Sequence, residues 1–282
     1  MTGHSGVVRI GVAAPASRID TALAARVSRL AGERHAGRAE IVFHPQCFLS
    51  DGHFAGDDDT RARAFLELAN DPGFDALWVA RGGYGSCRLA AQIVAGLRPP
   101  AHNKIYLGYS DAGTLLAALY REGFSRLAHG PMPADLLRDN GETAVARALD
   151  FLVDRAPHTL EPSVDGSHPT AAFNITILAH LLGTGFEPDL SDHIVMLEDV
   201  SEHMYRIDRS LWQITRNPGF RRVAGIRLGR VSAVPPNEPD FGKTEDDVMR
   251  HWCRESGIAY LGRAEIGHDV ENRIVPFGRW PD

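Results

Sequence analysis

Short apolar segments and longer amphipathic segments alternate along the first half of the chain. The apolar segments are short and rich in branched residues, which is typical of buried strands. They predict strands at residues 7–14, 41–44, 76–80 and 104–109. The intervening segments have a helical period and predict helices at residues 20–32, 57–70, 88–96, 111–122 and 143–154. This alternation predicts an α/β fold in which a parallel sheet carries helices on both faces.

The periodic pattern stops at residues 156–170, a stretch rich in Pro, Ser, His and Asp. Such a composition is typical of a linker. Beyond it, the pattern predicts helices at residues 174–182, 204–215 and 245–256, and strands at residues 193–197, 223–231 and 259–262. We therefore predict an N-terminal α/β domain (1–155), a linker (156–170) and a smaller C-terminal α/β domain (171–282).

The composition narrows the classes of function. Hydrophobic residues make up 44% of the 282 residues and charged residues 23%, which is the mixture of an ordinary globular protein. The formal charge of −6 is spread over both halves without a basic block, and this argues against a nucleic-acid surface. We therefore expect a small-molecule substrate.

Neither a membrane segment nor a secretory signal is evident in the sequence. No apolar stretch approaches the roughly 18 residues of a membrane helix, and no basic region precedes the first apolar segment. We therefore expect a cytoplasmic protein. Cys47, Cys87 and Cys253 lie far apart, a spacing that predicts free thiols and neither a disulfide framework nor a metal site.

A serine follows the predicted strand at residues 104–109. Ser110 lies at the junction with the next helix, two residues after Gly108. Small neighbours permit a tight turn that lifts a nucleophilic hydroxyl above the edge of the sheet. The Gly-x-Ser-x-Gly pattern is incomplete, because Ala112 occupies its last position. A serine followed by Asp111 is also a common helix N-cap, so capping is the alternative role.

A glycine-rich loop, Arg81-Gly82-Gly83-Tyr84-Gly85, follows the preceding strand. Parallel strands of an open α/β sheet end at one edge, where ligands bind. Backbone N–H groups of the loop could therefore stabilise an oxyanion beside Ser110. Arg81 and Tyr84 are candidates for substrate binding, and Arg81 could pair with a carboxylate or brace the loop. A simple turn or a phosphate cradle is the alternative, although no Gly-Lys-Ser/Thr follows.

A serine nucleophile needs a base within hydrogen-bond reach. Among the 13 histidines, His268 lies in a polar loop after the last predicted strand, although a solvated surface histidine is the more common case. Glu198 directly follows four apolar residues, so its carboxylate is expected to be partly buried and to need a His or Arg partner. A cap or a salt bridge for the acidic pair Glu198-Asp199 is the alternative.

Several short motifs together resemble the LD-carboxypeptidase family of serine peptidases, which includes the microcin-immunity peptidases. The matching stretches extend over nearly the whole chain: Arg81 to Gly85, Gly108-Tyr109-Ser110-Asp111, His129-Gly130-Pro131-Met132, Asn174, Leu182-Gly183-Thr184, Leu197-Glu198-Asp199-Val200, Tyr205 to Arg209, Ala224-Gly225-Ile226, Leu228-Gly229, and Gly267-His268 with Asn272 and Pro276.

The resemblance implies a parallel α/β N-terminal domain, a smaller C-terminal domain and an active site in the cleft between them. It also implies a triad in which Ser110 is the nucleophile, His268 the general base and acid, and Glu198 the residue that orients the histidine. The oxyanion hole would be formed by the backbone N–H groups of Gly83 and Asp111. The implied reaction releases a terminal D-alanine from a murein tetrapeptide in peptidoglycan recycling, without metal or cofactor, and the implied assembly is a homodimer.

The sequence departs from the family pattern at two places. Ala172-Phe173 stand where the family has a glycine pair, which could reshape the wall of the substrate site. Asp269 follows the histidine where a glycine is common, and its charge could raise the pKa of His268. Two other functions therefore stay open. One is an immunity-type peptidase that hydrolyses a peptidyl or acyl nucleotide, and the other is a catalytically silent muropeptide-binding protein.

Overall fold

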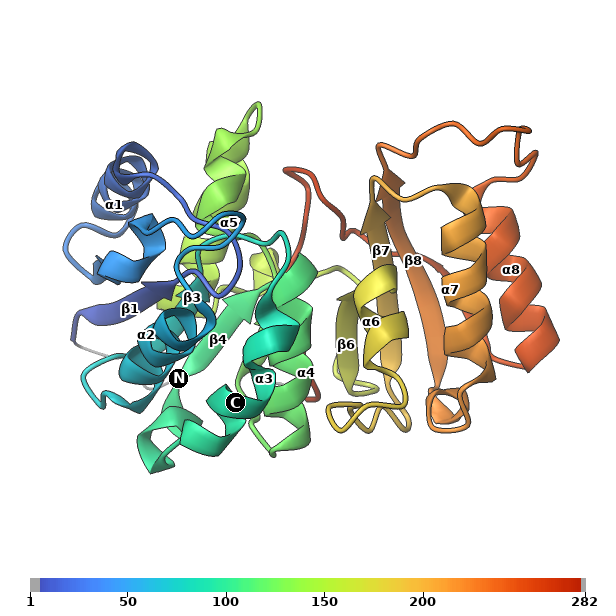
Figure 1. Cartoon of the computed structure of the whole chain (residues 1–282), viewed down its shortest axis with the longest axis horizontal. Helices are drawn as coiled ribbons and strands as arrows, with labels where there is room; N and C mark the ends of the chain where they lie inside the picture. The colour runs from blue at the N-terminus through green and yellow to red at the C-terminus, as the bar shows by residue number, and fades with distance from the viewer. Residues whose placement is uncertain (1–5, 280–282) are drawn as a thin grey trace.

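The computed structural model describes residues 6–279, which form two α/β units packed side by side (Figure 1). The first unit contains a six-stranded sheet in the order β10-β5-β4-β3-β1-β2. Its strands pair in parallel except β10, which is antiparallel to β5. The strand bounds are Val8–Ala13 (β1), Ala39–Phe43 (β2), Ala76–Val79 (β3), Ile105–Gly108 (β4), Leu127–His129 (β5) and Val275–Pro276 (β10).

Helices cover both faces of this sheet. Helices α2 (Asp58–Asn70), α3 (Ser86–Gly96) and α4 (Gly113–Arg121) pack on one face, and α1 (Thr21–His35) and α5 (Gly141–Asp154) pack on the other. Side-chain caps define the starts of two of them, because Asp20 accepts from the N–H of Leu23 and Asp57 accepts from the N–H of Thr60. The predicted α/β class with helices on both faces is confirmed.

The second unit contains a smaller parallel sheet in the order β6-β7-β8-β9. Its strands are Thr170–Asn174 (β6), Ile194–Val200 (β7), Gly225–Ser232 (β8) and Tyr260–Arg263 (β9). Helices α6 (Ile175–Leu181), α7 (Met204–Arg216) and α8 (Glu245–Ser256) lie together on one face (Figure 1). None of the helices in residues 6–279 combines the length and apolarity that a membrane span requires.

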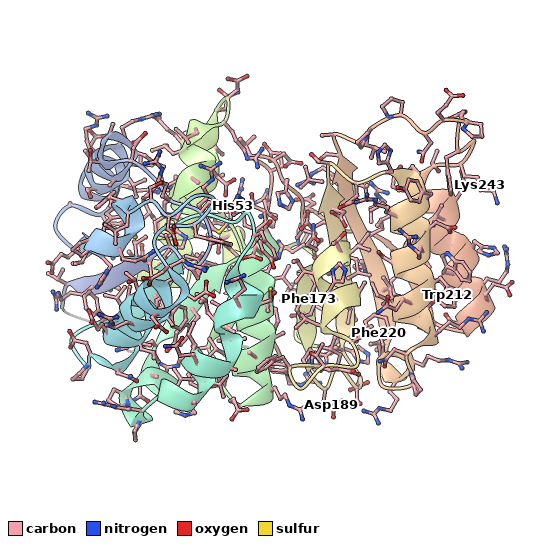
Figure 2. All side chains as sticks on the ribbon, in the orientation of Figure 1. His53, Phe173, Asp189, Trp212, Phe220 and Lys243 are labelled. Carbon is pink, nitrogen blue, oxygen red and sulfur yellow. The ribbon has the colours of Figure 1, made fainter. Side chains whose placement is uncertain are left out.

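The two units share a hydrophobic core. Phe173 on β6 packs edge-on against Phe277 with ring centroids 5.1 Å apart, and both side chains are fully buried. Phe173 lies at the seam between the units (Figure 2). Burying one such side chain is worth about 1.5–3 kcal/mol. Ala172 is buried as well. The expectation that Ala172-Phe173 reshapes a substrate wall is therefore wrong, because both residues lie in the core.

Three strands were not predicted, and each of them is short or atypical in composition. β5 has three residues, β10 has two residues including a proline, and β6 is rich in alanine. β10 is added to the first sheet from the C-terminal end of the chain. The single helix expected over residues 111–122 is instead a 3₁₀ turn at Ser110–Ala112 followed by α4 at Gly113–Arg121. The boundaries 155 and 171 stay predictions.

Candidate active site

Ser110 follows β4 in a left-handed backbone conformation, with φ of 59°. A non-glycine residue in this region is strained, and such strain is common at functional sites. The chain before the turn is closely packed, because a Cβ on Gly108 would lie 3.0 Å from the Cβ atoms of Ala112 and Val79. The turn leaves the Ser110 side chain partly exposed at the carboxyl end of the sheet.

The glycine-rich loop lies directly against this serine. A Cβ on Gly82 would be 3.0 Å from both Cβ and Oγ of Ser110, so only glycine permits this approach. Gly83 is exposed with φ of 116°. The Asp111 carboxylate accepts from the N–H of Ser86 at 2.9 Å, so it links the loop to the serine turn. Burial raises the pKa of Asp111.

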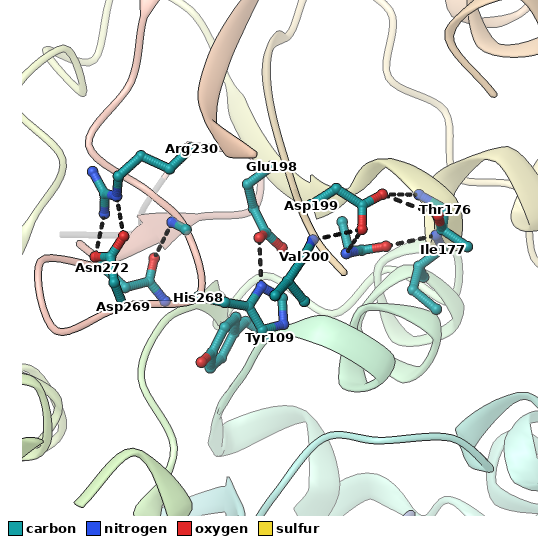
Figure 3. Close-up of polar contacts among 12 residues, drawn as sticks. Tyr109, Thr176, Ile177, Glu198, Asp199, Val200, Arg230, His268, Asp269 and Asn272 are labelled. Carbon is teal, nitrogen blue, oxygen red and sulfur yellow. Dashed lines mark hydrogen bonds and ion pairs between the residues drawn. The ribbon is translucent and has the colours of Figure 1, made fainter. Parts of the chain in front are cut away.

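Glu198 and His268 form a buried hydrogen-bonded pair. Glu198 Oε2 lies 2.6 Å from Nδ1 of His268 (Figure 3). The Glu198 side chain is fully buried and that of His268 is 8% exposed. Burial by itself disfavours the imidazolium, but the Glu198 carboxylate outweighs this effect and the pKa of His268 is raised. The predicted need of Glu198 for a histidine or arginine partner is thus met.

The ring of His268 packs against Tyr109, the residue before Ser110. The two ring centroids are 4.8 Å apart (Figure 3). The other ring nitrogen, Nε2, is buried and has no hydrogen-bond partner among the described residues. Nε2 therefore remains available for a hydrogen bond. Tyr109 thus joins the ring of His268 to the turn that carries Ser110.

A second carboxylate, that of Asp135, accepts a hydrogen bond from Tyr109. The Tyr109 hydroxyl donates to Asp135 at 2.7 Å, and Arg138 Nε donates to the same oxygen at 2.9 Å. Burial keeps the pKa of Tyr109 well above its usual value, so the phenol stays neutral. Nothing in the sequence singled out Asp135. The only local signal is its position three residues after Met132, whose backbone N–H it accepts from at the start of a 3₁₀ turn.

The acidic pair Glu198-Asp199 divides into two roles. Asp199 accepts from the Asn174 side chain at 2.8 Å and from the N–H of Thr176 at 3.0 Å (Figure 3), and so holds the start of α6. Burial and the neighbouring Glu198 charge raise the pKa of Asp199 to about 6. The capping alternative therefore applies to Asp199, whereas Glu198 serves His268.

Asp269 does not act on His268 as the sequence suggested. Its carboxylate forms a two-bond ion pair with Arg230, in which one Arg230 nitrogen lies 2.8 Å from Oδ1 (Figure 3). The raised pKa of His268 comes from Glu198 and, to a smaller extent, from Asp135. The expectation for Asp269 is wrong because a paired carboxylate projects little net charge.

Arg81 and Tyr84 lie on the exposed side of the glycine loop. Arg81 makes one long contact, 3.5 Å to the carbonyl of Arg18. Tyr84 is 51% exposed, and its ring centroid is 6.1 Å from that of Phe54. Both side chains are thus free to meet a ligand, and their substrate-binding roles stay predictions. Over residues 6–279 there is no group of three or more His, Cys, Asp or Glu residues arranged to hold a metal.

The sequence matches two protein-family profiles. The profile of the LD-carboxypeptidase N-terminal domain matches residues 10–130, and that of the LD-carboxypeptidase C-terminal domain matches residues 170–281. Together these matches include most of both α/β units.

Proteins with similar sequences carry carboxypeptidase names. The chain is 33% identical over 247 residues to a carboxypeptidase-named protein of Synechocystis sp., a match that includes 85% of this chain and 79% of that protein. It is 28% identical over 287 residues to the murein tetrapeptide carboxypeptidase of Pseudomonas aeruginosa, with coverage of 96% and 91%.

Solved structures share the fold. The muramoyltetrapeptide carboxypeptidase from Oxalobacter formigenes superposes with a TM-score of 0.77 at 23% identity, covering 96% of this chain and 93% of that one. The microcin C7 self-immunity protein MccF, in complex with aspartyl sulfamoyl adenosine, superposes with a TM-score of 0.76 at 17% identity, with coverage of 98% and 92%.

Proposed function

The chain belongs to the LD-carboxypeptidase family, and we propose that it is a serine carboxypeptidase whose catalytic triad is Ser110, His268 and Glu198. The observation that carries this proposal is the 2.6 Å bond between Glu198 and His268, whose ring packs against Tyr109, the residue before Ser110 in its strained turn. The Ser-His-carboxylate arrangement recurs on unrelated folds and is recognised by its geometry.

The proposed reaction has two steps. His268 Nε2 takes the proton of the Ser110 hydroxyl as Oγ attacks the carbonyl carbon of the scissile amide. Collapse of the tetrahedral intermediate breaks the C–N bond, and His268 gives the proton to the leaving amine, so that an ester to Ser110 remains. In the second step His268 deprotonates water, which attacks the ester. The acid product leaves and Ser110 regains its proton.

The oxyanion of each intermediate needs donors that are already in place. We assign this role to the backbone N–H groups of Gly83 and Asp111. The Asp111 N–H lies at the start of the helical turn that leads into α4, where unpaired N–H groups and the helix dipole favour negative charge. The close approach of Gly82 to Ser110 supports the assignment, because it brings the loop backbone beside the nucleophile.

The substrate we propose is a murein tetrapeptide, cleaved at the L,D-amide that releases its terminal D-alanine. The names of the Pseudomonas and Oxalobacter proteins support this class of substrate. Recycling of peptidoglycan fragments in the cytoplasm is the role that follows from it, and a homodimer is the assembly we expect. Neither metal nor cofactor enters the proposed chemistry.

Three peptides that differ only at the C-terminus test the substrate. We expect a tetrapeptide ending in D-Ala to exceed both its L-Ala epimer and its C-terminal amide by on the order of a hundredfold or more in kcat/KM. With the carbonyl held between Ser110 and the oxyanion donors, a change of chirality moves the terminal methyl and carboxylate to other positions. The amide removes the charge that an arginine would bind. Release of the terminal residue is measured for each peptide.

Two outcomes would redirect the assignment. Equal rates on all three peptides would contradict the proposed specificity for an L,D-amide. They would favour an immunity-type peptidase, an alternative that the fold shared with MccF supports. A wild-type protein that no serine-directed covalent probe labels at Ser110 would instead be the silent muropeptide binder.

The pH dependence of kcat/KM should follow the ionisation of His268. As a general base the imidazole must be neutral, so kcat/KM should rise with pH through the pKa of His268 and level off above it. Because the Glu198 carboxylate raises that pKa, the midpoint should lie above the ordinary value of about 6.5. The measurement is kcat/KM between about pH 5 and 9, a range that extends on both sides of the ordinary histidine pKa.

Asp199 is the control for this profile, because its pKa is raised to about 6. Asp199→Asn should leave the midpoint in place, since that carboxylate bonds to the start of α6 and not to His268. A midpoint below 6.5, or one that moves with Asp199→Asn, would count against the assignment of the base.

A further inference from the structure

The loop that carries His268 connects β9 of the second sheet to β10 of the first sheet. It therefore passes from one unit to the other, and the position of the catalytic imidazole depends on how the loop is held. Glu198 fixes one edge of the ring from the second unit. From the same unit, the N–H of Arg230 donates to the carbonyl of Ile266 at 2.8 Å. From the first unit, Arg147 and His129 contact the loop.

Arg147 makes two of the contacts that reach the loop from the first unit. It lies on α5, on the far side of the first sheet from α2, α3 and α4, and is 8% exposed. Its NH1 donates to the carbonyl of Val270 and to the carbonyl of Asn272, both at 2.8 Å. Burial lowers the pKa of Arg147, so burying this guanidinium has a cost that specific contacts must offset. One arginine thus donates hydrogen bonds to the backbone carbonyls two and four residues after His268.

Asn272 closes the same loop on itself. Its fully buried side chain has Oδ1 3.2 Å from the N–H of Gly267, the residue before His268. The same oxygen lies 3.2 Å from Nε2 of His129 on β5. Burial lowers the pKa of His129 to about 4, so its ring is neutral, and Nε2 must carry the hydrogen because Oδ1 can only accept.

We propose that Arg147 and Asn272 are positioning residues that lock the His268 loop onto the first unit and thereby set the imidazole against Ser110. The proposal rests on the serine mechanism described above. Its physical basis is that Ser110 and His268 come from different units, so their relative placement must be fixed by contacts that cross the seam. Neither Arg147 nor Asn272 touches the reacting atoms.

Arg147→Lys is the main test, because it keeps the charge but places its nitrogen one bond short of the NH1 position that donates to both carbonyls. A displaced catalytic group weakens the transition state more than the ground state. We therefore expect kcat to fall by roughly tenfold to a hundredfold with KM within about twofold of wild type. Labelling of Ser110 by a serine-directed fluorophosphonate should slow by the same factor.

Arg155→Lys is the matched control. Arg155 follows the end of the same helix, and its NH1 also donates to two backbone carbonyls, those of Phe151 and Leu152. These acceptors lie within α5 and far from the His268 loop in sequence. The substitution therefore repeats the chemical change without touching the loop, and kcat should stay at the wild-type value.

Hydrogen exchange supplies a readout that is independent of turnover. Arg147→Lys should increase amide exchange in the segment 266–274. Arg155→Lys should leave exchange in this segment at the wild-type rate. Asn272→Ala is the second variant and should show the same local exchange and the same loss of kcat, so a poorly folding Arg147→Lys would still leave the proposal testable. The double variant should lose less than the product of the single effects, because the two residues hold one loop.

The outcomes separate this proposal from the serine mechanism. If Arg147→Lys and Asn272→Ala both keep kcat within twofold of wild type, or leave exchange in the segment 266–274 unchanged, the positioning role is refuted. If the wild-type protein neither turns over nor reacts with the probe, the serine mechanism fails instead, and the exchange measurement still decides whether Arg147 and Asn272 hold the loop.

Discussion

Replacing Ser110 with alanine is expected to reduce kcat on the order of 10⁶-fold, which amounts to abolished turnover. Without the hydroxyl no acyl-enzyme can form, and the remaining donors only bind the substrate. Residues of a triad act as one unit, so His268→Ala should cost about as much, and the double variant should lose little more. Steady-state release of D-alanine from a murein tetrapeptide measures the effect.

The fold should survive these substitutions. Ser110 has φ of 59°, a conformation that costs a non-glycine residue about 1 kcal/mol or more. Alanine keeps this strain, so the thermal midpoint of Ser110→Ala should match that of the wild type. Ser110→Gly should relieve it and unfold at an equal or higher temperature while remaining inactive. Activity above a few per cent in Ser110→Ala would show that another group is the nucleophile.

The second large effect is expected for Glu198→Gln, with kcat lowered by about 10⁴-fold and KM little changed. The carboxylate accepts the Nδ1 hydrogen of His268 at 2.6 Å and so keeps Nε2 free to take the serine proton. A glutamine amide can present its NH₂ to Nδ1, which favours the tautomer with the hydrogen on the wrong nitrogen. Loss of the negative charge should also lower the pKa of His268, so the residual activity should persist to lower pH.

The neighbouring acid provides the control for this variant. Asp199→Asn makes the same chemical change one residue further along β7, where the carboxylate holds the start of α6. It should lower the thermal midpoint and leave kcat close to wild type. If Glu198→Gln raised KM alone, Glu198 would be a substrate ligand and would not orient His268.

Much of the fold was predictable because it follows from local patterns. Alternation of branched apolar segments with amphipathic ones placed most helices and strands to within a few residues, and α8 at Glu245–Ser256 was located at both ends. Its start is marked by Thr244 and Asp247, which cap each other. Ser110 and Glu198 stand out for a similar reason, because a polar residue directly after an apolar strand is visible without any tertiary information. His268 lies in a polar loop, and only the family resemblance singled it out among the 13 histidines.

Only the tertiary structure decided the features that depend on residues far apart in the chain. The strands β5 and β10 are too short to show a period, and they form by pairing with distant segments, β5 with β4 and β10 with β5. The sequence shows Glu198-Asp199 as one acidic pair and places Asp269 beside His268. The fold separates the two acids into an imidazole partner and a helix cap, and it cancels the charge of Asp269 with Arg230.

The role of Arg147 also depends on residues far apart in the chain and is not visible in the sequence. Among many arginines on helices, nothing in its sequence neighbourhood distinguishes it from Arg155, which bonds only within its own helix. Its two bonds to the loop of His268 span 123 and 125 residues of sequence. The amino-acid pattern by itself determined the class of fold, because it follows from local periodicity, and it marked Ser110 and Glu198 as polar residues at strand ends. The proposed triad additionally needed the family resemblance to select His268. The partners that hold these residues in place were decided by long-range packing.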